Sequence, residues 1–220
     1  MNKTEVKKKF SKLEEMLSQK VDERSLQKYL EENAFMVTGF GGHVHKNIVI
    51  SQLPLGNDFR TDFAWLDGSS AGTTIHLIEI ESASLQIFNE NGDFSQPYNH
   101  AIQQLKDWHH WANRNQQYLV NLLEPLELFE NHLRVSCRLI AGRRSCLNSL
   151  KKKRRYESLH EELPKWAHTQ TWDGFVKTIP FARYAGSHSD YIKCVSYRDQ
   201  NYFEKDVEDA IYGAQKGFGF

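Results

Sequence analysis

The chain has 220 residues, of which 40% are hydrophobic and 12% aromatic. That is enough apolar material for a sizeable core, so disorder throughout the chain is excluded and one domain with appended segments is expected. Its 28 Lys and Arg residues balance 28 Asp and Glu residues, and the resulting net charge of zero excludes an attraction of the whole molecule to nucleic acid, so any DNA-binding surface must be a local patch.

The cysteines and the N-terminal segment indicate the compartment. Cys137, Cys146 and Cys194 are odd in number and show no CxxC or Cys/His spacing, so neither a disulfide framework nor a zinc site is indicated. The segment MNKTEVKKKF lacks the apolar stretch of a secretory leader, and no run approaches the roughly 18 apolar residues of a membrane helix. We therefore expect a soluble, cytoplasmic protein with free thiols and no membrane contact.

Two helices are predicted at the start of the chain, over residues 4–33. Their apolar positions follow a helical period that is interrupted near residue 21, and Asp22 is the expected N-cap of the second helix. Three glycines then break the chain, and the segment 43–51, HVHKNIVIS, alternates as a strand does. A loop containing Pro54 and Gly56 follows.

The rest of the chain alternates strands and helices up to about residue 182. In chain order the sequence predicts strands over 60–67 and 73–82 joined as a hairpin, a helix over 98–119, a strand over 132–141, a charged helix over 151–166, and a short strand with a helix start over 169–179. This order is typical of a mixed α/β layer fold. We divide the chain into an N-terminal helix at 1–21, a central domain at 22–182, and a tail or oligomerisation segment at 183–220.

Three carboxylates on the predicted hairpin form a candidate site. Asp62 lies on its first strand, and Glu79 and Glu81 lie two apart on the second, so the two glutamates share one face of a strand whose neighbours are apolar. A buried charge is costly unless it is paired or bound to metal, and Mg²⁺ or Mn²⁺ accepts hard oxygen ligands of this kind. The alternative from spacing alone is an exposed face of an edge strand, where acids are ordinary.

The ordered set of segments resembles a known family. The segments are LQKYLEENAFMV, RTDFAWL, IHLIEIESAS, NHAIQQLKDWHHW, LIAGRRSCLN and TWDGFV, and together they look like the nuclease domain of the Shedu antiphage defence proteins, in the PD-(D/E)XK nuclease superfamily. The resemblance covers about residues 25–180. It implies an α/β restriction-endonuclease-like fold in which a mixed central sheet is flanked by helices.

The resemblance also implies roles for four residues. Asp62 matches the Asp of the first half of the motif, Glu79 the acidic residue of the second half, and Gln104 the glutamine of the following helix, so Asp62 and Glu79 would hold Mg²⁺ or Mn²⁺. Glu81 stands where the family pattern has a lysine that orients or activates the attacking water. A glutamate there could accept the proton of that water or bind a second metal, and it could equally mark a domain that binds DNA without cutting it.

Two further questions stay open in the sequence. His100 and Gln104 are four residues apart on one helix, so they share a face and His100 could contact a phosphate or a water, although a helix-surface histidine without a role is the commoner case. Superfamily members often direct another glutamate of the first core helix at the metal centre. Glu23, Glu31 and Glu32 are the candidates, and the sequence does not choose among them.

Basic and aromatic residues give weaker signals. Seven positive charges fall within thirteen residues, and they are Arg143, Arg144, Lys151, Lys152, Lys153, Arg154 and Arg155. The first five are the candidate nucleic-acid-binding residues, since such a run can bind several phosphates, and the alternative is the solvated face of a charged helix. The tryptophans Trp65, Trp108 and Trp111 are expected to pack in the core rather than to stack on bases.

Residues and resemblance together predict a metal-dependent DNA nuclease of an antiphage defence system, with DNA as its substrate and Mg²⁺ or Mn²⁺ as its cofactor. A second hypothesis is a catalytically silent relative that binds DNA ends or a phage component and acts through assembly. A third is a regulatory or structural domain without nucleic-acid contact, which the zero net charge favours. The resemblance further implies a homo-oligomer, with a tetramer as its suggested size.

Overall fold

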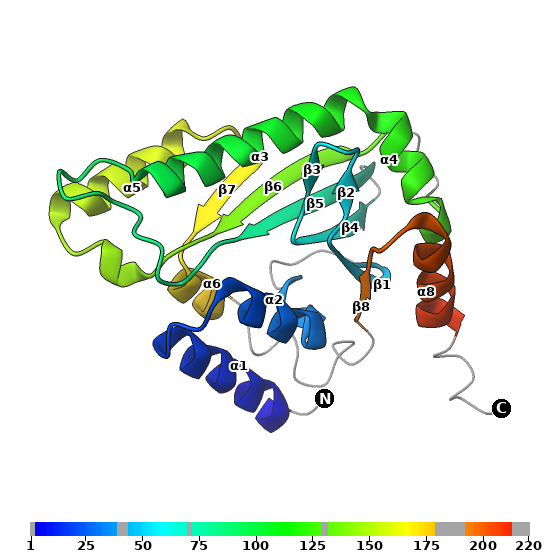
Figure 1. The fold of residues 1–220 in the computed structure, drawn as a ribbon, viewed down its shortest axis with the longest axis horizontal. Helices are drawn as coiled ribbons and strands as arrows, with labels where there is room; N and C mark the ends of the chain where they lie inside the picture. The colour runs from blue at the N-terminus through cyan, green and yellow to red at the C-terminus, as the bar shows by residue number, and fades with distance from the viewer. Residues whose placement is uncertain (1–2, 39–43, 70–71, 129–131, 179–191, 213–220) are drawn as a thin grey trace.

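The computed structural model describes residues 3–38, 44–69, 72–128, 132–178 and 192–212, and it is built around one mixed six-stranded sheet (Figure 1). The strands lie in the spatial order β7-β6-β5-β4-β1-β8. Their bounds are Val44–Ser51 for β1, Phe63–Ser69 for β4, Gly72–Ile80 for β5, Arg134–Ile140 for β6, Ala167–Gln170 for β7 and Lys193–Ser196 for β8. The expectation of a mixed α/β fold with a central sheet is confirmed.

Strand directions fix how the sheet presents its side chains. β4 pairs antiparallel with both β1 and β5, which confirms the predicted hairpin, whereas β5, β6 and β7 are parallel to one another and β8 is parallel to β1. Phe63 lies opposite Ile78 in the hairpin. Because side chains alternate between the two faces of a strand, this register decides which residues of β4 and β5 share a face.

Helices cover both faces of the sheet (Figure 1). Their bounds are Lys3–Ser18 for α1, Glu23–Glu32 for α2, Gln96–Arg114 for α3, Gln116–Leu122 for α4, Leu150–Glu162 for α5, Trp172–Thr178 for α6 and Gln200–Tyr212 for α8, with short 3₁₀ turns at Ala34–Met36 (η1), Glu124–Leu126 (η2) and Arg144–Cys146 (η3). α3 and α5 lie on one face, and α1, α2 and α6 lie on the other. Within the described residues no helix has both the length and the apolar character that crossing a membrane requires.

Each face of the sheet contributes to its own apolar cluster. Leu77 and Leu139 face Leu105 and Trp108 of α3, whereas Trp65 belongs to the cluster that packs against the N-terminal helices. Trp65 and Trp108 are fully buried and Trp111 is partly buried, which confirms that the three tryptophans serve packing. The apolar residues of β5 therefore hold the strand between two layers of helices.

Two local expectations were wrong. The helix predicted over 98–119 is divided at Asn115, whose side-chain amide donates to the backbone oxygen of Trp111 and so competes with continuation of the helix. The predicted loop around Gly56 contains a two-stranded ladder of Pro54–Leu55 (β2) with Phe59–Arg60 (β3). Gly56 has a φ of +63° and a Cβ there would lie 2.9 Å from the Trp111 ring, so the turn requires glycine.

The C-terminal segment joins the sheet. β8 extends the sheet beyond β1, and α8 packs Phe203 and Val207 into the cluster on the α3 side. The sequence shows no clear periodicity here, because a four-residue strand at a sheet edge needs little of it. The assignment of 183–220 as a tail or oligomerisation segment stays a prediction, and 183–191 and 213–220 lie outside the described residues.

Candidate active site

The hairpin brings Asp62, Glu79 and Glu81 to one end of the sheet. Asp62 immediately precedes β4 rather than lying within it as expected, and its Oδ2 accepts a 2.8 Å hydrogen bond from the backbone N–H of Ile80 on β5. Glu79 is the second-to-last residue of β5, and Glu81 follows the strand with its backbone N–H donating to Ile140 of β6 at 2.8 Å. The predicted grouping of these three acids is what the register of β4 and β5 produces.

Gln104 joins the group from the helix above. Its Nε2 donates a 2.9 Å hydrogen bond to Oε1 of Glu79. α3 is held in place by the buried side chains of Leu105 and Trp108 and is capped by Ser95, whose hydroxyl accepts from the backbone N–H of Tyr98. The orientation of Gln104 toward β5 therefore follows from the packing of the whole helix.

Burial makes these carboxylates hard to ionise. It is the main cause that raises the pKa of Asp62 to about 7, against the lowering effect of the Ile80 N–H. Burial, followed by the charge of Asp62, raises the pKa of Glu79 to about 10, and Asp62 and Glu79 share a hydrogen bond. The pKa of Glu81 is also raised by burial, while His100 lowers it. At neutral pH the cluster without a cation therefore retains protons that a bound cation would displace.

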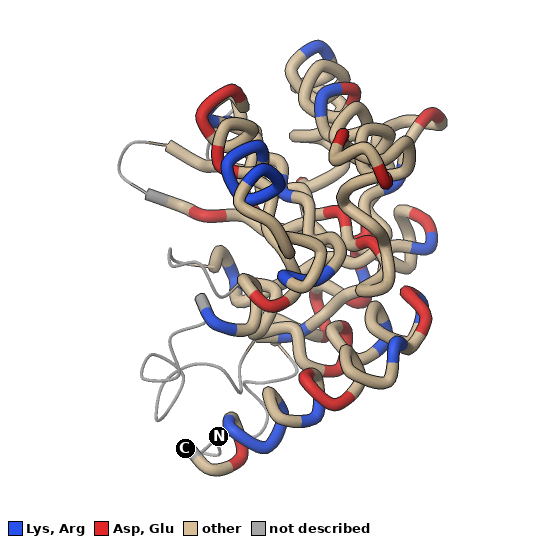
Figure 2. The backbone as a smooth tube through the Cα atoms, turned by 90° about the vertical axis from the view of Figure 1, so that its left-hand side faces the viewer, with Lys and Arg blue, Asp and Glu red and all other residues tan. Residues whose placement is uncertain are grey.

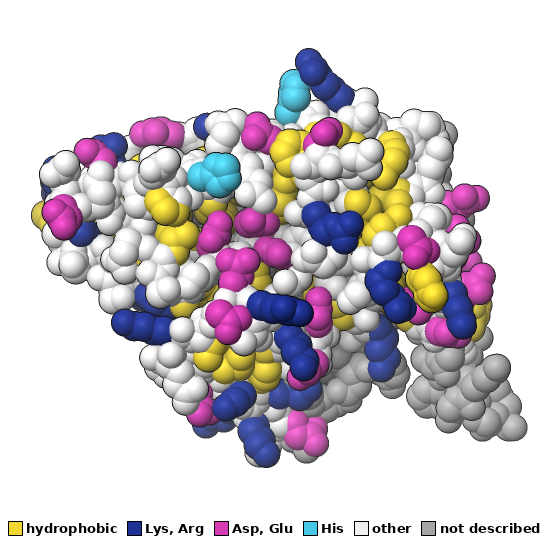
Figure 3. Space-filling model, in the orientation of Figure 1, with side chains coloured by type: hydrophobic (Ala, Val, Ile, Leu, Met, Phe, Trp, Pro, Cys, Tyr) yellow, Lys and Arg dark blue, Asp and Glu magenta, His cyan; other side chains and the backbone are white. Residues whose placement is uncertain are grey.

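Glu23 is the fourth acidic residue of the cluster. It is the first residue of α2 and directly follows Asp22. The Asp22 side chain accepts a 2.9 Å hydrogen bond from the Ser25 backbone N–H, which confirms Asp22 as the N-cap. The charge of Glu23 raises the pKa values of all three acids of the hairpin. In the space-filling view acidic side chains gather on the face between α3 and α2 (Figure 3).

Glu31 and Glu32, the other two candidates, interact elsewhere. The charge of Glu31 raises the pKa of Cys194, and that of Glu32 raises the pKa of Tyr29. In the sequence Glu23 differs from Glu31 and Glu32 by its place next to the helix cap Asp22. The effect of its charge on the hairpin acids depends on how α2 packs, so spacing alone did not reveal it.

No lysine replaces the one that the family pattern places at Glu81. Across the described residues, neither Lys nor Arg forms an ion pair with Asp62, Glu79 or Glu81. Lys106, two residues after Gln104, is exposed on the outer side of α3. The charge of His100 lowers the pKa of Glu81, so the helix face shared by His100 and Gln104 borders the acids.

The donor set fits a hard divalent cation held by few protein ligands. Among the described residues, no three His, Cys, Asp or Glu side chains are arranged to enclose a metal ion by themselves. Mg²⁺ and Mn²⁺ commonly use one or two carboxylates, with water and substrate phosphate oxygens completing the shell. Asp62 and Glu79, partly buried and unpaired by any cationic side chain, are suited to that smaller role.

Three residues of the basic run, Arg143, Lys151 and Arg155, bind other parts of the protein. Arg143 donates from Nε and Nη2 to the two carboxylate oxygens of Asp173 at 3.0 and 2.8 Å, which ties the end of β6 to α6. Lys151 donates to the backbone oxygen of Asn91, and Arg155 pairs with Asp93 at 3.4 Å. The helix α5, which carries residues 151–155 of this run, faces the viewer in Figure 2.

Of the five predicted nucleic-acid-binding residues, Arg143 and Lys151 thus have protein partners, and Lys152 lies over the Phe88 ring at 5.8 Å. Arg144 and Lys153 have no side-chain hydrogen bond or ion pair within the described residues. A role of these five in binding nucleic acid stays a prediction.

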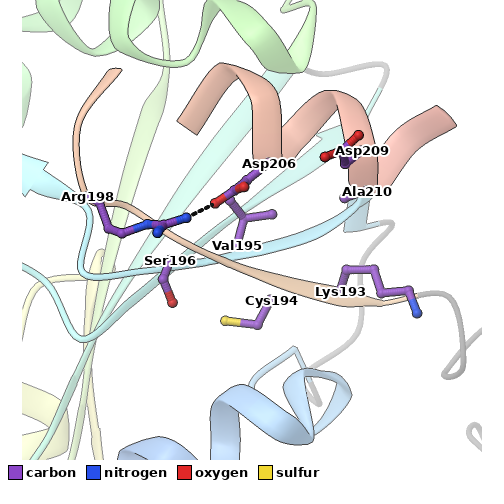
Figure 4. A pocket seen from close by; sticks show the side chains of 8 residues that line it. All are labelled: Lys193, Cys194, Val195, Ser196, Arg198, Asp206, Asp209 and Ala210. Atoms are coloured by element: carbon purple, nitrogen blue, oxygen red, sulfur yellow. Dashed lines mark hydrogen bonds and ion pairs between the residues drawn. The ribbon is translucent and has the colours of Figure 1, made fainter. Parts of the chain in front are cut away.

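A cavity of about 810 Å³ lies away from the acids, between β8 and α8 (Figure 4). Val195 points from β8 toward α8, whereas Cys194 and Ser196 point to the opposite side. Arg198 pairs with Asp206 at 2.9 Å across the cavity wall. None of the four predicted catalytic residues lines this space.

Comparison with known proteins identifies a family for this chain. Residues 20–176 match a family model described as Shedu protein SduA, C-terminal, which is more than half of the chain and includes every residue of the acidic cluster. No curated protein matches the chain.

Proposed function

This chain belongs to the family of the Shedu protein SduA, and we propose that it is a metal-dependent DNA nuclease with a PD-(D/E)XK, restriction-endonuclease-like fold. Membership of the Shedu family points to a role in antiphage defence. The observation that carries the nuclease proposal is the convergence of Asp62, Glu79 and Gln104, in which both acids are largely buried yet have no cationic partner among the described residues.

The proposed roles follow from the contacts of each side chain. Asp62 and Glu79 hold Mg²⁺ or Mn²⁺, which, when bound, lowers the pKa of a coordinated water and stabilises negative charge on the phosphoryl oxygens. Asp62 is oriented by the Ile80 N–H and Glu79 by the Gln104 amide, so both carboxylates are fixed before substrate arrives.

Glu81 would act as the general base. The attacking water loses a proton to its carboxylate as a new P–O bond forms, and the P–O bond to the leaving oxygen of the strand breaks. His100, whose positive charge lowers the pKa of Glu81, favours the ionised carboxylate that can accept this proton. The raised pKa of Glu81 makes it a stronger base than an exposed glutamate.

A cleavage assay tests the proposal. Linear and circular DNA are incubated with Mg²⁺, Mn²⁺ or a chelator, and the native protein is compared with Asp62→Ala, Glu81→Ala and Glu81→Lys. Glu31→Gln serves as a matched acidic control outside the cluster. We expect metal-dependent cutting that is lost in Asp62→Ala and Glu81→Ala and kept in Glu31→Gln. Cutting that persists in a chelator, or in Asp62→Ala, contradicts the assigned site.

The second candidate is a silent relative that binds DNA ends or a phage component through assembly. Glu81 in the place of the lysine favours it, together with the lack of any Lys or Arg ion pair to the described acids. Native protein that binds DNA without cutting it, and a Glu81→Lys variant that gains cleavage, would establish this candidate. In either case we propose a homo-oligomer, with a tetramer as the first size to test by light scattering.

A further inference from the structure

A cavity of about 410 Å³ lies between α5, the turn η3 and the junction of β7 with α6. Its volume is in the range of small-molecule sites. None of Asp62, Glu79, Glu81 or Gln104 lines it, so its occupant need not be the DNA strand that is cut. Apart from the density of basic residues on α5, no sequence pattern indicates this cavity.

Two unpaired cations from different elements meet at its wall. Arg144 comes from η3 and Lys153 from α5. The backbone N–H of Arg144 is fixed by a 2.6 Å hydrogen bond to Oδ2 of Asp173, the carboxylate that also binds Arg143. The main chain of Arg144 is thus anchored while its guanidinium makes no side-chain bond within the described residues, which leaves its planar fork of donors for a ligand.

Neutral donors line the same space. Gln170 has its Nε2 buried without a hydrogen-bond partner in the described part of the chain, and such a donor is normally satisfied. The Thr171 hydroxyl accepts from the backbone N–H of Gly174 at 3.1 Å, so its own hydrogen is left to donate. Two cations and the Thr171 hydroxyl around one cavity match the several acceptor oxygens of a phosphate group.

The rest of the cavity lining includes hydrogen-bond acceptors, which favour a ligand that carries donors. Glu157 lies one helical turn after Lys153 and supplies a carboxylate that accepts hydrogen bonds. His160, on the next turn, has its pKa lowered by burial and so adds an acceptor more readily than a charge. A bare inorganic anion would leave the Glu157 carboxylate facing it, whereas a sugar hydroxyl or a base amino group would satisfy that carboxylate.

We propose that this cavity binds a nucleotide with a terminal phosphate, in which Arg144 and Lys153 contact the phosphate and Glu157 contacts the sugar or base. The nucleotide is either free in solution or the terminal residue of a strand, because the two share this chemistry. The site is separate from the carboxylate cluster, so the proposal does not depend on nuclease activity.

Calorimetric titration of the full chain with a chelator present tests it. The probes are AMP, adenosine, inorganic phosphate, and a short oligonucleotide with a 5′-phosphate or a 5′-hydroxyl. The variants are Arg144→Gln and Lys153→Gln, and Arg154→Gln is the control, since Arg154 adjoins Lys153, carries the same charge and does not line the cavity. Unchanged melting midpoints show that each variant is folded.

We expect AMP or the 5′-phosphorylated strand to bind, and the matching probe without phosphate to bind at least about tenfold more weakly. Arg144→Gln and Lys153→Gln should each weaken binding by about tenfold, and Arg154→Gln should leave it unchanged. Binding of AMP identifies a free nucleotide, and binding of the phosphorylated strand alone identifies a strand end. The proposal is overturned if neither binds at millimolar concentration, if inorganic phosphate binds as tightly as AMP, or if Arg154→Gln weakens binding as much as Lys153→Gln.

Discussion

Gln104 on α3 donates a 2.9 Å hydrogen bond from Nε2 to Oε1 of Glu79 on β5. The contact joins two residues that are 25 positions apart in the chain, and the Glu79 carboxyl also interacts with Asp62. Gln104 is therefore a positioning residue in the proposed site, because it fixes a carboxylate that would bind the metal.

Replacing this amide should weaken metal use more than folding. In Gln104→Ala we expect DNA cleavage at limiting Mg²⁺ to fall by roughly 10- to 100-fold, the range typical of a lost partner of a metal ligand. Raising the Mg²⁺ concentration should recover part of the rate, which a merely structural defect would not allow. Gln103→Ala is the control, since Gln103 is exposed and bonds Asp107. Equal losses in both variants would remove the positioning role.

The stability of the metal-free protein should fall as pH rises. The pKa of Asp62 is raised from 3.8 to about 7 by burial, so the folded state holds its proton more tightly than the unfolded state. The tighter binding of this proton stabilises the folded state. Its contribution to the free energy of unfolding is fully present below about pH 4 and is lost as pH rises through about 7. Asp62→Asn removes this titration, so at pH 8 it should raise the unfolding midpoint by roughly 5 °C, given that each kcal/mol shifts the midpoint of a protein this size by about 2–4 °C.

Thermal melts in a chelator at pH 5 and pH 8 measure this effect. The difference between native protein and Asp62→Asn should be larger at pH 8, because the buried carboxyl is then forced to ionise. Added Mg²⁺ should stabilise the native protein more at pH 8 than at pH 5, since protons compete with the ion for the same oxygens. A native protein whose midpoint does not depend on pH between these values would contradict the raised pKa.

Removing the charge of Glu23 should make the cluster easier to ionise. Its charge raises the pKa values of Asp62, Glu79 and Glu81, so Glu23→Gln should shift the acid limb of the pH–rate profile to lower pH, by roughly 0.5 unit for one exposed charge in a solvent-like dielectric. Glu31→Gln lies on the same helix and should leave the profile in place. If both variants shift it equally, the effect is the net charge of α2 rather than the position of Glu23.

The Arg143–Asp173 pair should contribute to stability rather than to DNA binding. Arg143→Ala removes two charged hydrogen bonds from a partly buried carboxylate, and we expect a loss of roughly 1–3 kcal/mol in the free energy of unfolding. Arg143→Lys keeps the charge but not the planar fork, so it should recover less than half of that loss. Denaturant titration measures both. A variant of unchanged stability that binds DNA more weakly would reverse the assignment.

Sequence patterns predicted the parts of the fold that are locally determined. Side-chain type and the spacing of apolar residues are local properties of the chain. They were enough to predict the cap at Asp22, the β4–β5 hairpin and the burial of the tryptophans. The division of the long helix at Asn115 and the small β2–β3 ladder were missed, because each depends on one side chain competing with the backbone or on a contact with Trp111.

Local sequence patterns were enough to identify which acids could act together, because Asp62, Glu79 and Glu81 belong to one predicted hairpin and residues two apart on a strand share a face. The packing of distant elements was needed to show that the charge of Glu23 acts on these acids, that Gln104 reaches Glu79 and that Arg143 binds Asp173. It also shows that Arg144 and Lys153 have no side-chain partner within the described residues. These contacts join elements far apart in the chain, so they are set by how the helices pack on the sheet and not by any periodicity within one segment.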